Sequence, residues 1–158
     1  MVVSGPGVMQ GYLSGDQHEN GVIDSQGRLH TGDLGWFDSD GYLHLVGRKS
    51  EMIKTAGERV FPREIEDCIQ LHPGVKESAV VGLPDPVLGE QIVAAVVAKP
   101  GARLDEANLK RHCLRHLPFV RAPSEIRILD RLERTASGKP DRRALVRTLS
   151  FPEEVGLR

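Results

Sequence analysis

The chain has 158 residues, and its 21 Lys and Arg against 22 Asp and Glu give a formal charge of −1. This balance argues against a general nucleic-acid-binding protein, which normally carries a basic excess. Two cysteines are too few for a disulfide framework or a four-cysteine zinc site. The longest purely apolar run, residues 92–98, is far shorter than a membrane-spanning helix. We therefore predict no membrane span and a location in the reducing cytoplasm.

Residues 1–47 consist of short alternating runs, such as residues 29–34 and 42–46, separated by turn sequences. The turn sequences are Gly5-Pro6-Gly7, Asn20-Gly21, Ser25-Gln26-Gly27 and Asp38-Ser39-Asp40-Gly41. Short runs separated by Gly, Asn and Asp are typical of β-hairpins. We expect a β-rich segment here, without a helix of useful length.

After Gly47 the pattern becomes mixed. Pro62 suits the first turn of a helix, and apolar residues then recur at helical spacing until Pro73-Gly74. Further along the chain the pattern predicts strands, helices and a polar loop: strands at 75–81, 91–98 and 124–129, helices at 106–117 and 142–149, and a loop at 134–140. This order predicts an α+β fold, a small two-layer domain with helices packed on a short, mainly three-stranded sheet.

Three short motifs suggest binding chemistry, and each also has an ordinary structural explanation. The loop around Ser137-Gly138-Lys139 could bind a phosphate through its backbone donors and a mobile cation. Its ordinary explanation is a solvated surface loop. Asp33 follows a tight Thr-Gly step and either accepts bonds from paired hydroxyls or caps a turn. Gly57 either allows a close backbone approach to a ligand or is a turn glycine.

The cysteines and histidines do not form a recognisable metal-binding pattern. His112 and His116 lie four residues apart on a predicted helix, but the sequence offers no obvious third ligand. Cys68 and Cys113 lie among apolar helical positions, where free cysteines usually pack in the core. We expect no metal site within this chain.

Taken together in chain order, five motifs resemble those of one family. They are Thr31-Gly32-Asp33, residues 40–48 from Asp40-Gly41-Tyr42 to Gly47-Arg48, residues 51–57, Pro62-Arg63-Glu64-Ile65-Glu66, and Arg134-Thr135-Ala136-Ser137-Gly138-Lys139. Each motif alone is weak, but all five occur with the spacing of the AMP-forming adenylate ligases. This family comprises acyl- and aryl-CoA synthetases, carrier-loading adenylation domains and luciferases.

The resemblance implies a two-step reaction. A carboxylate attacks the α-phosphate of MgATP to give an acyl-adenylate, and a thiol, usually that of coenzyme A, then forms a thioester and releases AMP. In this family a small C-terminal lid rotates between the steps. By resemblance, residues 1–47 match the end of the large N-terminal domain, residues 48–50 the hinge and residues 51–158 the lid.

The resemblance also assigns expected roles to individual residues. Asp33 would hold the ribose hydroxyls, and Arg48 would also approach the ribose. Lys139 would be the catalytic residue of adenylation, bridging the substrate carboxylate and ATP. Gly57 would line the pantetheine channel from the opposite face of the lid. Lys54 and Arg59 are weaker candidates for contacts with phosphate or coenzyme A.

Two substitutions and one absence depart from the family pattern. Ser50 occupies the hinge position, where the family commonly has Asp or Lys, and Glu133 replaces the usual proline before Arg134. The phosphate loop, acyl pocket and magnesium motif of the family would precede Gly5. We therefore expect an N-terminal adenylation domain, in cis or as a separate chain, to provide most of the active site and the Mg²⁺ site.

The sequence leaves two alternatives to a CoA ligase open. The lid segment 54–62 resembles the CoA-ligase version more closely than that of enzymes loading a carrier-protein thiol. A non-catalytic module that kept the lid fold is the other alternative, although retention of Asp33, Gly57 and Lys139 argues against it. Strands in residues 1–47 without sheet partners would also favour self-association.

Overall fold

The computed structural model describes residues 1–11 and 22–150. The chain divides into two compact units, Met1–Ser50 and Glu51–Arg158. Among the described residues, no helix is long and apolar enough to cross a membrane.

The first unit consists of small strands, which confirms the expected β-rich segment. Its strands are β1 (Val2–Val3), β2 (Leu29–His30), β3 (Asp33–Phe37) and β4 (Leu43–Arg48). They form two antiparallel two-stranded sheets, β1 with β2 and β3 with β4. The expected turn at Ser25-Gln26-Gly27 is present, with Gly27 at a φ of +72°. The expected turn at Asn20-Gly21 lies outside the described residues.

The second unit is an α+β domain with a five-stranded sheet. Its sheet strands are β5 (Ile53–Thr55), β6 (Glu58–Val60), β7 (Val75–Asp85), β8 (Gly89–Ala98) and β9 (Glu125–Ile128). Its helices are α1 (Pro62–Gln70), α2 (Glu106–His116) and α3 (Arg142–Ser150), with a short 3₁₀ turn η3 (Phe119–Arg121) after α2. Another 3₁₀ turn, η2 (Lys49–Glu51), includes residues of both units. β8 is central, antiparallel to β7 and parallel to β9.

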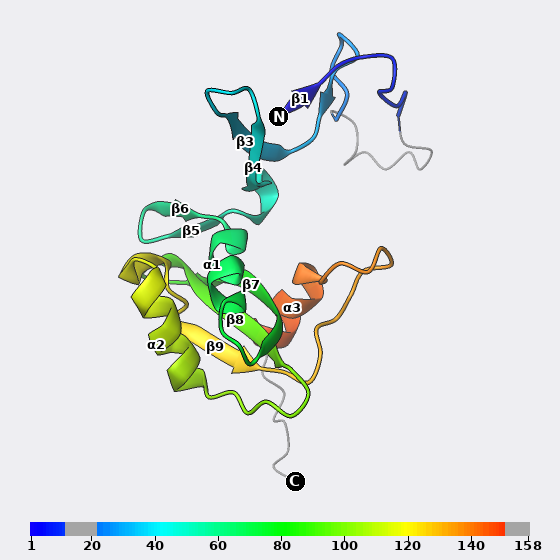
Figure 1. The fold of residues 1–158 in the computed structure, drawn as a ribbon. Helices are drawn as coiled ribbons and strands as arrows, with labels where there is room; N and C mark the ends of the chain where they lie inside the picture. Colours follow the sequence, from blue (N-terminus) through cyan, green and yellow to red (C-terminus); the bar gives the residue numbers. More distant parts are fainter. Residues whose placement is uncertain (12–21, 151–158) are drawn as a thin grey trace. The chain divides into compact units, whose positions relative to one another are not determined.

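Both faces of the sheet are covered by helices (Figure 1). In β8, Ile92, Ala94 and Val96 join a buried cluster with residues of α1 and α2, whereas Val93, Ala95 and Val97 join a second cluster with residues of α3. The α+β class, the three expected central strands and the three helices are confirmed. The domain has three layers and not the two expected, because α3 covers the second face of the sheet.

Two local features differ from the sequence expectations. Residues 53–60 form a hairpin, β5–β6, whose strand β5 adds to the sheet through Thr55 and Gly89. Strand β7 continues through Pro84 to Asp85, beyond the expected strand end at residue 81. Pro84 is tolerated there because β7 is an edge strand, and a proline without an N–H leaves an edge strand intact.

An ionic clamp closes the free edge of β7. The Val80 N–H donates to Glu66 Oε1 of α1 at 2.8 Å, and the Val80 carbonyl accepts from Arg142 Nη1 of α3 at 2.7 Å. Arg142 also forms a bidentate pair with Glu66, at 2.7 and 3.1 Å, and its Nε lies 3.3 Å from Glu51 Oε2. The clamp thus satisfies the edge N–H and carbonyl of Val80, which no strand pairs, and joins helices on opposite faces of the sheet.

Replacing Arg142 therefore tests the clamp. We expect Arg142→Met to lower the free energy of unfolding by about 3 kcal/mol, because it leaves the partly buried Glu66 carboxylate without its cation. Arg143→Met, at the exposed neighbouring position, is the matched control and should change it by less than about 0.5 kcal/mol. Urea denaturation measures both values, and equal effects would contradict the clamp.

Candidate functional site

Asp33 and Arg48 face each other at the open end of the β3–β4 hairpin. They are register partners, and Arg48 Nε lies 3.3 Å from Asp33 Oδ1. The Asp33 N–H donates to Thr31 Oγ1 at 3.1 Å, and Gly32, at a φ of +74°, turns the chain between β2 and β3. The Asp33 side chain remains partly accessible, with a relative exposure of 26%. A fixed, accessible carboxylate beside a guanidinium can accept hydrogen bonds from hydroxyl groups of a ligand.

Ser50 separates residues that are anchored to different units. The N–H of Lys49 donates to the Gly32 carbonyl at 2.9 Å within the first unit. Glu51 pairs with Arg142 within the second unit. Ser50 itself is exposed and lies within the short turn η2. The anchored residues of the two units thus flank Ser50 in the sequence.

The loop around Lys139 is held closed by its own hydrogen bonds. Thr135 N–H donates to the Lys139 carbonyl at 2.8 Å, and Gly138 N–H donates to the Thr135 carbonyl at 2.9 Å. The backbones of Arg134 and Pro140 pair as an isolated antiparallel β-bridge. Arg134 also donates to the Gly138 carbonyl and pairs with Glu77 of β7. Neither Glu77 nor the bracing role of Arg134 was expected, because their contact spans distant parts of the sequence.

Lys139 itself is exposed at this loop. Its ammonium makes no hydrogen bond or ion pair with any residue in the described part of the chain. Two residues later, the Asp141 side chain caps α3 by accepting from the Ala144 N–H at 3.0 Å. A mobile cation on a fixed loop suits transient contact with an anion.

Gly57 lies at the tip of the β5–β6 hairpin. Ala56 and Gly57 both have positive φ angles, +48° and +81°, as a two-residue type I′ turn requires. No atom lies within 4 Å of a Cβ added at Gly57, so the space beside it is open. The turn alone accounts for glycine at this position, and the open space is compatible with the expected channel role.

Two cations lie side by side on the same hairpin. Lys54 and Arg59 are register partners on neighbouring strands, and both side chains are exposed. Like charges directly opposite each other destabilise a strand pair and would be neutralised by an anionic ligand. Arg121 of η3 braces the hairpin through Glu58, at 3.0 Å, and also pairs with Glu64. These carboxylates raise the pKa of the Arg121 guanidinium above its usual value.

The candidate residues thus form separate groups. Asp33 and Arg48 form one group in the first unit, whereas Lys54, Gly57 and Arg59 form another in the second. Figure 1 shows that the β5–β6 hairpin and the loop before α3, which carries Lys139, project from opposite sides of the second unit.

The structure brings Cys68 to His112 and His116, a grouping that the sequence analysis did not find. One potential ligand atom from each residue lies within 4.8 Å of the others. Burial raises the pKa of the Cys68 thiol, and it raises that of the neighbouring Cys113 to about 12. Both cysteines are therefore neutral thiols at pH 7 and pack in the core, as expected.

The sheet, its helices and the lysine-bearing loop define the class to which the second unit belongs. Residues 64–139 match the model of the AMP-binding enzyme C-terminal domain. This segment is therefore similar to that family, and the predicted resemblance to adenylate-forming ligases is confirmed.

Curated relatives and solved structures agree with this assignment. The chain is 44% identical over 146 residues to the sulfoacetate–CoA ligase of Cupriavidus necator, covering 92% of this chain and 29% of that protein. It is 39% identical to the oxalate–CoA ligase of Arabidopsis thaliana, covering 89% and 27%. ATP-bound MatB from Rhodopseudomonas palustris superimposes with a TM-score of 0.82 at 36% identity, covering 92% and 29%. The chain thus spans less than a third of the length of these relatives.

The hairpin tip yields a prediction about backbone strain. Gly57→Ala should lower the free energy of unfolding by about 1 kcal/mol, because alanine is strained at a φ of +81° although nothing crowds its methyl group. Ala56→Gly is the reciprocal variant and should raise it by about 0.5 kcal/mol by relieving the same strain at residue 56. Chemical denaturation measures both, and a change of the same sign in both variants would contradict the type I′ turn.

Proposed function

We propose that this chain forms the C-terminal part of an AMP-forming acid–CoA ligase. The whole enzyme would use ATP to convert a carboxylic acid into an acyl-adenylate and pyrophosphate. The thiol of coenzyme A would then attack the acyl carbon, giving a thioester and AMP. The observation that carries the proposal is the match of residues 64–139 to the AMP-binding C-terminal domain, at whose end Lys139 projects on a braced loop.

In the adenylation step Lys139 would bridge the substrate carboxylate and ATP. Negative charge builds up on the α-phosphate as the carboxylate attacks, and a cation placed there lowers the barrier. The free ammonium of Lys139 and its short, hydrogen-bonded loop support this role, because little conformational freedom is left to lose when the loop docks.

Nucleotide binding would also use the first unit. The Asp33 carboxylate would accept hydrogen bonds from the two ribose hydroxyls of ATP or AMP, and Arg48, 3.3 Å away, would fix its orientation and approach the ribose. Mg²⁺ prefers carboxylate and water oxygens. The one group of three potential ligands within the described residues contains a thiol and two imidazoles instead. We therefore assign Mg²⁺ to the preceding domain.

Thioester formation would use the opposite side of the second unit. Gly57 would line the channel of the pantetheine arm, and the paired cations Lys54 and Arg59 would meet phosphates of coenzyme A. Rotation at residues 48–50, with the exposed Ser50 as the hinge, would exchange the two sides between the steps. The free thiols Cys68 and Cys113 fit a reducing cytoplasmic setting.

The half-reactions of a fusion protein test this function. The chain is joined to the preceding domain of the Cupriavidus necator relative, and acid-dependent pyrophosphate exchange is measured. We expect Lys139→Ala to lower this exchange at least about 100-fold, while thioester formation from supplied acyl-adenylate changes less than about threefold. Lys99→Ala, at another exposed lysine, is the matched control and should leave both steps unchanged.

Each other outcome of this experiment has a defined meaning. Equal loss of both half-reactions in Lys139→Ala would contradict the assignment of the two sides. Absence of exchange in the unsubstituted fusion would favour a non-catalytic module that kept the fold. Thioester formation with a phosphopantetheinylated carrier protein, in place of free CoA, would favour the carrier-loading alternative.

The exposed aromatic side chains of the β3–β4 hairpin predict self-association when the preceding domain is absent. Trp36, Phe37 and Tyr42 are 56%, 69% and 70% exposed. We expect a concentration-dependent dimer of this chain in sedimentation experiments, with a dissociation constant raised about tenfold by Phe37→Ser. Phe119→Ser, at a phenylalanine of the second unit that is 86% exposed, should not change it. A strictly monomeric chain would contradict the prediction.

A further inference from the structure

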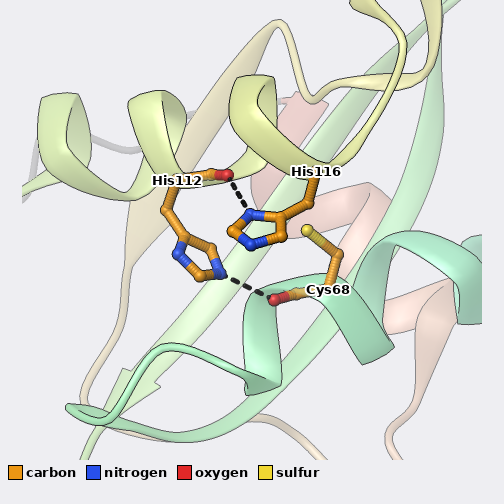
Figure 2. A group of neighbouring side chains, drawn as sticks. All are labelled: Cys68, His112 and His116. Atoms are coloured by element: carbon orange, nitrogen blue, oxygen red, sulfur yellow. Dashed lines mark hydrogen bonds between the residues drawn. The ribbon is translucent and has the colours of Figure 1, made fainter.

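The packing of α1 against α2 leaves a thiol and two imidazoles facing one another. Cys68 lies on α1, and His112 and His116 lie one turn apart on α2, so that all three meet in the gap between the helices (Figure 2). One potential ligand atom of each residue lies within 4.8 Å of the others. We propose that these three residues bind a divalent transition-metal ion, with Zn²⁺ as the natural occupant. This site goes beyond the proposed ligase function and shares no residue with it.

The hydrogen bonds of His116 already prepare it as a ligand. Its Nδ1 lies 2.8 Å from the carbonyl oxygen of His112, and since a carbonyl can only accept, Nδ1 carries the proton. The lone pair of the neutral ring is then on Nε2. Histidines that bind metals usually donate their other ring N–H to a carbonyl or carboxylate, which fixes both ring orientation and tautomer. His116 has this arrangement within one helical turn.

His112 would exchange one hydrogen bond for the metal. Its Nε2 lies 3.0 Å from the Cys68 carbonyl and donates to it, and Figure 2 shows the ring edge that carries Nε2 turned toward Cys68. On metal binding the proton moves to Nδ1, and the Nε2 lone pair becomes the ligand. Cys68 binds as the thiolate and releases its proton, so that one proton leaves for each ion bound.

The ligand set and spacing favour zinc. A mixture of thiolate and imidazole suits Zn²⁺, whereas Mg²⁺ and Ca²⁺ prefer oxygen ligands. Bond lengths of about 2.3 Å to sulfur and 2.0–2.1 Å to nitrogen place tetrahedral ligand atoms about 3.3–3.6 Å apart. The ligand atoms would therefore draw together by at most about 1.5 Å. The exposed His116 side chain can make this movement, and its exposure leaves the fourth position to water.

The nearby His72 serves as an internal control. Its ring packs edge-on against His112 with a centroid distance of 5.6 Å, but its Nδ1 accepts the Gly74 N–H at 3.2 Å. The neutral ring of His72 thus carries its proton on Nε2 and offers no free lone pair to an ion. His72 lies beside the site without belonging to the ligand set.

Metal titration of the full chain tests the site without any measurement of ligase activity. Metal-free protein is titrated with Co²⁺, whose bond to a thiolate gives a charge-transfer absorption in the near ultraviolet, and Zn²⁺ is then added in competition. We expect one equivalent of Co²⁺ with this absorption, displaced by Zn²⁺. His116→Gln should weaken binding at least about 100-fold. His72→Gln should leave the affinity within about twofold.

Because Cys68 is buried, Cys68→Ser can fail to fold, and the exposed His116 provides the second, independent variant. A folded Cys68→Ser protein should lack the charge-transfer absorption. The thermal midpoint of the unsubstituted chain should rise with Zn²⁺ concentration, whereas that of His116→Gln should not. The proposal is overturned if Co²⁺ gives no thiolate absorption, if His72→Gln weakens binding as much as His116→Gln, or if Zn²⁺ stabilises both proteins equally.

Discussion

The arrangement of the second unit depends on one ion pair at the edge of its sheet. Strand β7 has β8 on one side and open backbone groups on the other, and Arg142 with Glu66 occupies both the N–H and the carbonyl of Val80 there. The pair thereby blocks edge-to-edge association and joins α1 to α3 around the sheet. Since Arg142 begins α3, the clamp also fixes where the preceding loop emerges. The position of Lys139 is thus tied to a contact far away in sequence.

The parts of the fold that could be predicted from sequence are those encoded by neighbouring residues. The helices were predictable because Pro62 and the apolar spacing are local signals. The covering of both sheet faces was also encoded, in the uninterrupted apolar run of β8, since one-sided strands alternate with polar residues. The β5–β6 hairpin was missed because Ala56-Gly57 is not a common type I′ turn sequence, and alanine adopts a positive φ there only with strain.

The residues of the candidate site also differ in whether the sequence alone could identify them. Asp33, Gly57 and Lys139 are identifiable because their motifs are contiguous in sequence. Their supporting partners are not, since Glu77 reaches Arg134 and Glu58 reaches Arg121 only after the sheet has formed. For the same reason Cys68 and His112, 44 residues apart, could not be joined by a spacing rule. Local motifs indicate the chemistry, whereas the residues that position it depend on tertiary packing.

The division of the core into two clusters has a consequence for local unfolding. The α3 side rests on a smaller set of contacts, chiefly those of Leu145 and Leu149 with β7 and β8, together with the Arg142 clamp. The α1 and α2 side shares the sheet but none of these buried side chains. Helix α3 is therefore expected to open locally as a cooperative unit, which removes the support of the Lys139 loop on its α3 side while the Arg134–Glu77 pair still ties the loop to β7. Amide exchange in this segment would report how often the loop loses its support.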